Sequence, residues 1–522
     1  MKTENKKRLR VGVAAVAVVT TAALALSGCS SAPAAPKKST ETLTISSALM
    51  PNSLNPAISG NGRAGVALYP AYEPLIRSKE DGSIEAALAT AWKVSDDLKQ
   101  ITFTLRKNVK FSNGEALTPD AVKNSIMFYK NFKGAPYAVN LKDLSDITTS
   151  GDSEVTIKFS SPQPDIGSMF NAAFNYGDII APAGLKNPDD LAKNTYGAGP
   201  YMIDASQTVS GSKWVYVPNP NYYDQSKIYW PKIEMSYYAD QNSAMQAFKA
   251  GQVMYMVSDP VTANANAATL PAGARVIYSP AQWTGVILSD RAGKVTPALG
   301  NVKVRQALNY GTDKAAIVKA LFGQFGAPTN QLQVEGFIGY DKANDSAYPY
   351  DPAKAKALLA EAGFANGFEM TLAYVKNTLN EAQFTAIQSQ WKELGVTVKG
   401  YTMATTPEIA TLAAKGTIGA ILGQSNANSP YLAYNQPLAA NGSYNIYNST
   451  DPELTKLYTA AVNAPASGQE AAWKAVHKWV VDQAWFDVIA ALPAVAIASN
   501  KVNAPKPGAA LVTDFVNITP KG

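Results

Sequence analysis

Alternating polar and apolar residues predict strands in two early segments of the chain. Residues Thr42–Ser46 alternate, and Ile101–Leu105 alternates strictly, with Phe103 and Leu105 on one face. Helix signals and strand signals are then mingled along the whole sequence. This mixture predicts a mixed α/β (α+β) fold rather than an all-α or all-β protein.

Two helix starts have the chemistry that helix N-termini favour. Thr118–Asp120 combines a capping hydroxyl, a proline at the first helical position and an acid near the positive end of the helix dipole. The residues that follow on one helical face are Val122, Ile126 and Tyr129. A second start at Asp351-Pro352 predicts a helix that ends at Gly363, because glycine favours the left-handed stop.

The first 28 residues do not fit a folded domain. Several Lys and Arg residues precede an uncharged, mostly apolar run from Val11 to Leu26, which predicts a signal peptide over residues 1–28. The run ends in Leu26-Ser27-Gly28-Cys29, which resembles the lipobox of bacterial lipoproteins. The resemblance implies lipidation of Cys29, with residues 29–41 as a flexible tether. A plain signal peptide or an uncleaved anchor is the alternative.

Composition narrows the function classes. The leader carries a net charge of +4 out of the total +6, which leaves about +2 for the mature protein and no basic excess that would favour nucleic acid. One cysteine excludes a disulfide within the chain and a multi-thiolate zinc site. We expect no metal and no cofactor. The body is longer than one core usually serves, so we expect two or three domains.

Five segments in order resemble the family 5 extracellular solute-binding proteins, the dipeptide-, oligopeptide- and nickel-binding receptors of ATP-binding-cassette importers. The longest is LATAWKVSDDLKQITFTLRKNVKFSNGEALTPDAVKNSI, at Leu88–Ile126. The others are YGAGPY (Tyr196–Tyr201), NPNYY (Asn219–Tyr223), VRQALNYGTDKAAIV (Val304–Val318) and YDPAKAKALLAEAGF (Tyr350–Phe364).

The resemblance implies a two-lobed clamshell of the type II periplasmic-binding-protein kind, with an extra small domain in the N-terminal half. The implied boundaries are residues 42–80, 196–279 and 493–522 for lobe I, 81–195 for the small domain, and 280–492 for lobe II. Crossovers near residues 282–289 and 491–498 would form the hinge. The ligand would bind between the lobes, which close around it.

The segment GQSNANSPYLAY, at Gly423–Tyr434, is the most informative candidate for ligand contact. Its amides and proline favour a solvated loop. In peptide-binding members of the family, a motif Trp-x-Ala-Asp-Tyr-x-x-Pro lies here, and its Asp pairs with the α-amine of the peptide. Aligning the proline on Pro430 puts Asn426 at the Asp position and Gln424 near the Trp position.

The missing acid leaves two ligand classes open. A buried ammonium without its carboxylate loses a charge-assisted hydrogen bond and keeps its desolvation cost. A peptide would then need another acid, such as Glu73 or Asp290, or mostly backbone contacts. Alternatively, the ligand is a neutral oligosaccharide or another uncharged solute. We favour the peptide because most of the family binds peptides.

The candidate ligand-binding residues are polar or aromatic, and each also has a structural interpretation as packing or as a solvated surface. They are Trp283, Gln424, Ser425, Asn426, Asn428, Tyr431, Tyr434, Arg63 and Tyr69. The only histidine, His477, follows a helical pattern, and we interpret it as a residue on a helix surface rather than a metal ligand.

These features favour a receptor over an enzyme. A hydrolase built on a Ser-His-Asp or Cys-His site has only His477 available, and neither HExxH nor GxSxG occurs. We therefore expect a non-enzymatic, monomeric, lipid-anchored receptor on the extracytoplasmic face of the membrane. Its partners would be a peptide or small-molecule ligand and the permease subunits of the importer. A surface hydrolase or chaperone is the alternative.

Overall fold

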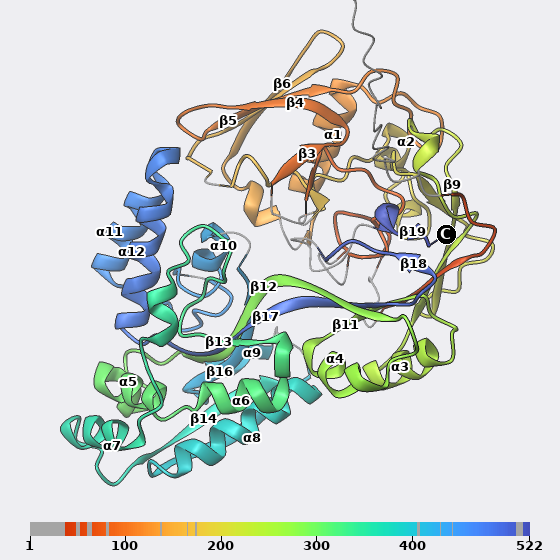
Figure 1. Ribbon diagram of the computed structural model, residues 1–522. Coiled ribbons are helices and arrows are strands. Elements are labelled where there is room, and N and C mark those ends of the chain that lie inside the picture. The colour runs from red at the N-terminus through yellow and green to blue at the C-terminus, as the bar shows by residue number, and fades with distance from the viewer. Residues whose placement is uncertain are drawn as a thin grey trace, which may run out of the picture. The chain divides into compact units, whose positions relative to one another are not determined.

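Most of the chain after the tether is described by the computed structural model (Figure 1). The described residues are 37–47, 53–59, 65–79, 83–135, 138–163, 165–172, 175–404, 408–427, 430–440, 442–507 and 515–521. The predicted signal peptide and Cys29 lie outside them, as do Arg63 and Asn428. Residues 37–522 form one unit.

A mixed sheet runs through this unit in the order β15-β14-β16-β12-β17-β11-β1-β10-β9-β8, and β13 pairs with β17 beside it. Its strands are β1 (Leu43–Ser47), β8 (Tyr201–Ile203), β9 (Lys213–Pro218), β10 (Ile233–Tyr237), β11 (Tyr255–Ser258), β12 (Arg275–Leu288), β13 (Ala327–Pro328), β14 (Phe368–Val375), β15 (Val396–Met403), β16 (Ala420–Asn426) and β17 (Phe486–Ala498). The long strands β12 and β17 pair antiparallel along their length. They join the strands of the first half of the chain to those of the second half.

Helices cover both faces of the β14–β16 part of the sheet. They are α5 (Val302–Tyr310), α6 (Lys314–Leu321), α7 (Pro352–Glu361), α8 (Thr378–Lys392), α9 (Glu408–Ala414), α10 (Pro430–Asn435), α11 (Pro452–Val462) and α12 (Gln469–Asp482). Alternation along β12 divides the core: Val286 and Leu288 pack with residues of α5–α8, whereas Trp283 and Ile287 pack with residues of α9–α12.

A second core belongs to the N-terminal part of the sheet. Leu43 and Ile45 of β1 pack with Tyr255 of β11 and with Phe515 near the C-terminus. The remaining helices of this part are α2 (Pro182–Lys186), α3 (Gln241–Lys249) and α4 (Pro260–Asn266). Two short strand pairs lie outside the main sheet: β2 (Ile76–Ser78) with β3 (Ile84–Ala86), and β18 (Val502–Asn503) with β19 (Thr519–Pro520).

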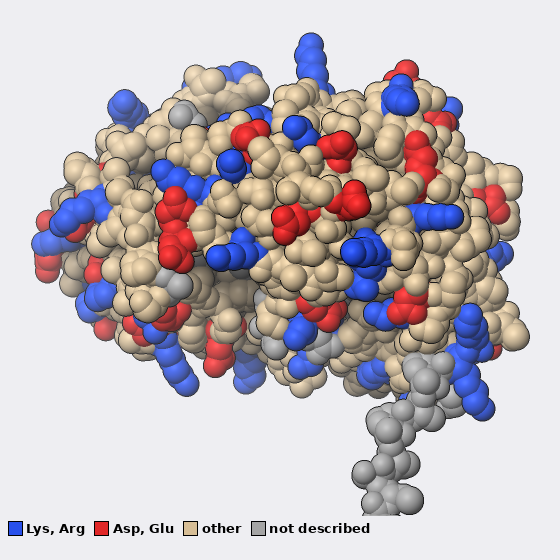
Figure 2. Space-filling view, turned by 90° about the horizontal axis from the view of Figure 1, so that it is seen from above, with Lys and Arg blue, Asp and Glu red and all other residues tan. Residues whose placement is uncertain are grey.

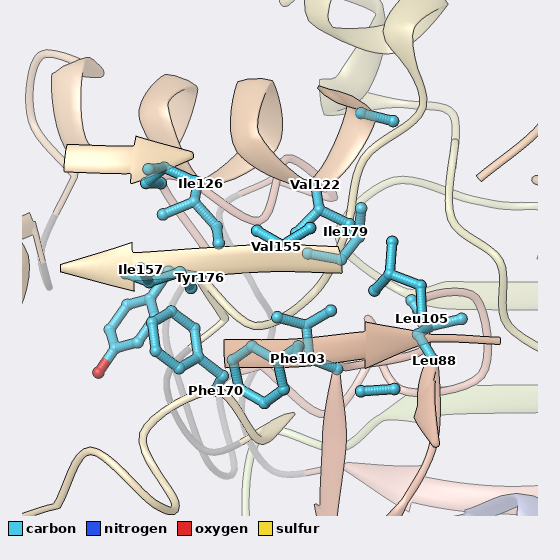
Figure 3. Close-up of a cluster of buried hydrophobic side chains, with 14 of the residues drawn as sticks. Leu88, Phe103, Leu105, Val122, Ile126, Val155, Ile157, Phe170, Tyr176 and Ile179 are labelled. Atoms are coloured by element: carbon cyan, nitrogen blue, oxygen red, sulfur yellow. The ribbon is translucent and has the colours of Figure 1, made fainter. Parts of the chain in front are cut away.

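A separate antiparallel sheet has the order β4-β5-β7-β6. Its strands are β4 (Ala89–Val94), β5 (Gln100–Leu105), β6 (Leu144–Ser150) and β7 (Glu154–Phe159). The helix α1 (Pro119–Asn131) packs on it, and Val122 and Ile126 meet Val155 in the cluster drawn in Figure 3. Phe103 and Phe170 meet edge to face in the same core, with ring centroids 5.6 Å apart.

The local sequence predictions are confirmed. Of the segment Thr42–Ser46, the residues from Leu43 onward lie in β1, and Ile101–Leu105 lies in β5. Thr118 accepts a hydrogen bond from the Ala121 amide at 3.1 Å, and Asp351 accepts one from the Lys354 amide at 2.9 Å. Gly363 follows α7 with φ of +86°, as the left-handed stop requires.

Two sequence predictions are wrong. The prediction of a loop for Gly423–Tyr434 fails for most of the segment, because Gly423–Asn426 belong to β16 and Pro430–Tyr434 lie in α10. The apolar residues that open β16 pair it with β12, and the polar residues after them stay in the same ladder. His477 does not lie on a helix surface. It is 1% exposed, because residues around Gly339 cover this side of α12.

Charged side chains of both signs are interspersed over the face seen in Figure 2. Among the described residues, no helix is long and apolar enough to cross a membrane.

Candidate ligand-binding site

Two sets of parallel strands point their carboxyl ends toward the middle of the main sheet. β1 runs parallel to both of its neighbours, β10 and β11, and β14 runs parallel to β15 and β16. Open sheets of this kind bind ligands just outside the carboxyl ends of parallel strands. In the two halves of the sheet, β11 ends at Ser258 and β16 ends at Asn426.

The register brings these two strand ends to the same stretch of β17. Ser258 pairs with Val495 of β17. Asn426 pairs with Gln282 of β12, which in turn pairs with Leu492 of β17. The two strand ends are therefore three residues apart along β17, which is roughly 10 Å at about 3.3 Å per residue. The topology thus places one candidate site where both carboxyl ends converge.

The side chains at this convergence are polar and uncharged. They are Ser258, Gln282, Thr284, Gln424 and Asn426. Gln424 is exposed and Asn426 is half-buried. The Thr284 hydroxyl donates to Oε1 of Gln383 on α8 at 3.1 Å. Ser258, Gln282 and Thr284 are buried, so Gln424 and Asn426 are the members of this set that offer accessible hydrogen-bond donors and acceptors, and both carry neutral amides.

The sheet divides the predicted site residues between its two faces. Trp283 and Ser425 pair directly across β12 and β16 and therefore share a face, whereas Gln424 and Asn426 lie on the opposite face. Trp283 is 0% exposed and meets Phe486 edge to face, with ring centroids 5.6 Å apart. The structure thus places Trp283 in the core, away from Gln424 and Asn426.

Tyr434 also belongs to the core. Its ring stacks on Tyr458 with centroids 3.6 Å apart and an interplanar angle of 11°. Burial raises the pKa of Tyr434, so its hydroxyl stays protonated. Tyr431 lies in the same short helix, and its side chain is outside the described residues. Tyr69 is buried in the core of the N-terminal part of the sheet.

A set of hydrogen bonds behind β16 holds the segment in place. The Ser425 hydroxyl donates to Oε1 of Gln436 at 2.7 Å, and the Tyr444 hydroxyl donates to the Gln424 carbonyl at 3.3 Å. The Tyr444 amide donates to the Gln436 carbonyl at 3.0 Å. These bonds attach the turn after α10 to the strand that carries the candidate residues.

Asn445 is the centre of that turn, and sequence reasoning did not find it. Its amide nitrogen donates to the carbonyls of Leu438 and Ala439, both at 3.0 Å, and to the carbonyl of Ser449 at 2.8 Å. Its oxygen accepts from Nη1 of Arg291 at 3.1 Å. Asn445 lies in a Tyr- and Asn-rich stretch, and the residue spacing there does not predict a buried side chain with several hydrogen bonds.

The two acids considered as partners for a peptide amine are already engaged. Glu73 forms an ion pair with Arg77 at 2.6 Å and accepts from the Tyr223 hydroxyl at 2.9 Å. Asp290 accepts from the amides of Lys294, Val295 and Thr296, at 2.9, 2.6 and 2.6 Å, and so closes a tight loop after β12. Both carboxylates have internal roles that ligand binding would have to disrupt.

Metal binding finds no support in the part of the chain that the structure describes, where no group of three or more His, Cys, Asp or Glu side chains is placed to hold an ion. Nδ1 of His477 lies 3.0 Å from the Gly339 carbonyl oxygen, within hydrogen-bonding distance. Burial lowers the pKa of His477 to about 4, so the ring is neutral at neutral pH.

Comparison with known proteins gives a family match over most of the chain. The model of the bacterial extracellular solute-binding proteins, family 5 Middle, matches residues 83–448. A probable D,D-dipeptide-binding periplasmic protein of Escherichia coli is 30% identical over 372 residues, which cover 69% of this chain and 70% of that protein. The dipeptide-binding protein of Escherichia coli is 28% identical over 399 residues, covering 69% and 71%.

Solved structures agree on the fold. An ATP-binding-cassette-transporter-associated periplasmic binding protein of Helicobacter pylori, in complex with the peptide STSA, superposes with a TM-score of 0.78 at 20% identity. The match covers 93% of this chain and 99% of that one. A periplasmic binding protein of Agrobacterium tumefaciens in complex with agropinic acid gives a TM-score of 0.76 at 23% identity, covering 92% and 99%.

These comparisons confirm the predicted mixed α/β fold of type II periplasmic binding proteins and the prediction of a solute-binding protein rather than an enzyme. They also confirm the family that the five sequence motifs resemble. The chain belongs to the bacterial extracellular solute-binding proteins of family 5.

Proposed function

We propose that this protein captures a peptide outside the cytoplasm and delivers it to the permease of an ATP-binding-cassette importer. The observation that carries the proposal is the family match over residues 83–448. It is supported by two relatives named for dipeptide binding, each aligned over about two thirds of both chains. The solved neighbour that holds the peptide STSA agrees with this ligand class.

The proposed contact surface is the uncharged end of β16 and the start of α10. Gln424 and Asn426 would meet the ligand from the strand, and Asn428 and Tyr431 would meet it from the segment that follows. Trp283, Ser425 and Tyr434 would support that surface from the core, as their burial favours. Arg63 and Tyr69 would contribute from the N-terminal half.

We place lobe I at residues 42–80, 196–279 and 493–522, the small domain at 81–195, and lobe II at 280–492. The support comes from the strands that join the cores. In β12, residues from Trp283 onward pack with the helices α5–α12, and in β17 residues up to Leu492 do the same, whereas Ala496 and Ala498 pack with β1. Ligand would stabilise the closed form only as far as it binds that form better.

The hinge would lie where Pro280 of β12 pairs with Pro493 of β17. Neither proline has an N–H to donate to the ladder, and the register shifts between Pro280 and Gln282. The strand pair β12–β17 therefore lacks two backbone donors at this point, which falls between the two cores.

Anchoring through a lipid on Cys29 is also proposed, on the strength of the Leu-Ser-Gly-Cys sequence, together with a monomeric state. A Cys29→Ser variant should leave the membrane fraction and appear in the soluble fraction. Membrane association that persists in the variant would contradict the lipid anchor.

One observation favours a second ligand class, a neutral solute such as an oligosaccharide. The strand β16 carries no charged side chain, and both Glu73 and Asp290 are engaged internally. A thermal-shift screen of the purified protein against peptides, oligosaccharides and metal chelates separates the two classes. Stabilisation by peptides supports the proposal, and stabilisation only by oligosaccharides or chelates would replace it.

A further inference from the structure

Arg291 is a buried cation that is not among the candidate ligand-binding residues. It follows β12, nine residues beyond Gln282, and is 9% exposed. Its guanidinium carbon lies 4.0 Å from the ring centroid of Trp485 and 5.5 Å from that of Phe486. Aromatic faces attract a cation, but they supply no hydrogen-bond acceptor in the guanidinium plane.

Within the described part of the chain, one nitrogen of this guanidinium has a hydrogen-bond partner and the other two have none. Nη1 donates to Oδ1 of Asn445 at 3.1 Å, whereas Nε and Nη2 are buried without a partner. Nε–H and one N–H of Nη2 lie side by side on one edge of the guanidinium. This edge is the fork that binds two oxygens of a carboxylate, phosphate or sulfate at once.

The charge of Arg291 is also uncompensated. Its sequence neighbour Asp290 has both oxygens occupied by backbone amides. Among the described residues, no ion pair joins Arg291 to a carboxylate. Burial lowers the pKa of Arg291 to about 9, and repulsion from Arg305 adds to this effect. A buried charge without a counter-charge is costly, so an anion beside Arg291 would stabilise the folded protein.

Arg305 makes the surroundings more cationic. It is 5% exposed, and its partners are carbonyls alone: Gln483 accepts from Nε at 3.2 Å and from Nη2 at 3.0 Å, and Leu299 accepts from Nη1 at 2.8 Å. Arg305 therefore shows the same fork filled by a neutral acceptor, whereas the fork of Arg291 is covered from solvent and has no acceptor among the described residues. Two neighbouring guanidinium groups favour an anion over a water molecule as the missing acceptor.

We propose that the unpaired Nε–Nη2 edge of the Arg291 guanidinium, buried beside Trp485 and Asn445, binds a small oxyanion such as sulfate, phosphate or a small carboxylate when the side chains that cover it move aside. The oxyanion would accept from Nε and Nη2 together and would neutralise the excess positive charge of the two arginines. Through Asn445 it would also stabilise the turn that carries Leu438 and Ala439. This site is separate from peptide capture and stands or falls independently of the proposed function.

The direct test is crystallographic and uses the unaltered protein. Crystals are soaked in sodium selenate or in sodium bromide, and anomalous differences are measured at the selenium and bromine edges. A selenium peak within hydrogen-bonding distance of Nε and Nη2 supports the oxyanion site. A bromide peak without a selenium peak would overturn the oxyanion class. An ordered water or a protein carbonyl at the fork would overturn the site itself.

A solution test uses the melting temperature at constant ionic strength while chloride is replaced by sulfate. The wild-type protein should show a saturable rise, which Arg291→Met should lose. Arg275→Met is the matched control, because Arg275 begins the strand β12 that Arg291 follows, and it donates to the Val502 carbonyl instead. It should keep the rise. An equal sulfate response in wild type and Arg291→Met would overturn the proposal; if Arg291→Met does not fold, the selenate measurement decides.

Discussion

Asn426 and Gln282 face each other across the β12–β16 ladder, and neither carries a charge. In the proposed site, the residue at this position would decide which ligand termini can be neutralised. An amide offers a dipole to carbonyl, amide and hydroxyl groups, whereas an ammonium needs a carboxylate to offset its desolvation. The proposed ligand preference therefore depends on Asn426 and Gln282 being uncharged.

Asn426→Asp should strengthen binding of peptides with a free α-amine by about 1.5–3 kcal/mol, the range for a hydrogen bond to a charged group. It should weaken binding of N-acetylated peptides. Titration calorimetry with matched free and acetylated peptides measures both effects. Gln424→Glu, on the same face, tests whether any added acid does the same. Unchanged affinity for every ligand in Asn426→Asp would remove this residue from the site.

Asp290→Asn should separate stability from binding. The new amide group would turn a donor toward backbone N–H groups that the carboxylate now accepts, so we expect a loss of about 2 kcal/mol in unfolding free energy. Ligand affinity should not change, because the carboxylate closes its own loop. Chemical denaturation and calorimetry give the two values. A large loss of peptide affinity with little change in stability would make Asp290 a ligand anchor instead.

His477 should make the protein less stable as the pH falls from about 6.5 toward 4. Burial lowers its pKa from 6.5 to about 4, so between these values the unfolded chain binds the proton and the folded chain does not. The stability is complete above pH 6.5, and about 3 kcal/mol is lost across the window. Denaturant unfolding at a series of pH values measures the slope, which His477→Gln should flatten.

The test is clean because His477 is the only histidine in the chain. The window between pH 6.5 and 5 also lies above the ordinary range of carboxylates. Nuclear magnetic resonance of the single imidazole reports its pKa in the folded protein directly. An imidazole that titrates near its ordinary value while the protein stays folded would contradict the burial.

Elements set by local chemistry could be predicted from the sequence, and elements set by distant partners could not. Thr118 and Asp351 cap their helices as their residue types require. The segment from Gly423 has the composition of a loop, yet pairing with β12, more than a hundred residues away, keeps Gly423–Asn426 extended. No spacing within the segment signals that pairing.

His477 shows the same limit on a helix. The pattern places it beside the apolar face of α12, which is compatible with either a surface or a buried position. The segment around Gly339 decides the outcome. Gly339 has φ of +84°, and a Cβ there would lie 2.7 Å from Cβ of Trp473 and 3.0 Å from Nδ1 of His477. Only glycine lets that segment cover the histidine, and the sequence does not reveal the approach.

The strand pair β12–β17 should bend at Pro280 and Pro493. Replacing both prolines by alanine restores two N–H groups to the ladder and should stiffen the junction. We expect a smaller ligand-induced decrease in the radius of gyration, measured by small-angle X-ray scattering. Pro328→Ala, in the short strand β13, is the control and should behave as wild type. A compaction equal to wild type in the double variant would move the hinge elsewhere.

For the whole molecule, the ordered series of motifs predicted more than any single segment did. The five motifs from Leu88 to Phe364 identify the family and the fold because each places a specific turn, cap or strand in sequence order. They do not identify the ligand, because the proposed contact surface combines strand ends that are far apart in sequence, such as Ser258 and Asn426. The site is assembled by sheet register, which is a non-local property.

Native mass spectrometry of the purified protein, mixed with defined libraries of short peptides and of oligosaccharides, tests the central claim most directly. The account predicts one peptide bound per protein chain, selected from the peptide library, and no oligosaccharide adduct. Omitting the peptide library serves as the control for co-purified ligand. An oligosaccharide adduct in preference to every peptide, or no adduct with any library member, would contradict a peptide receptor.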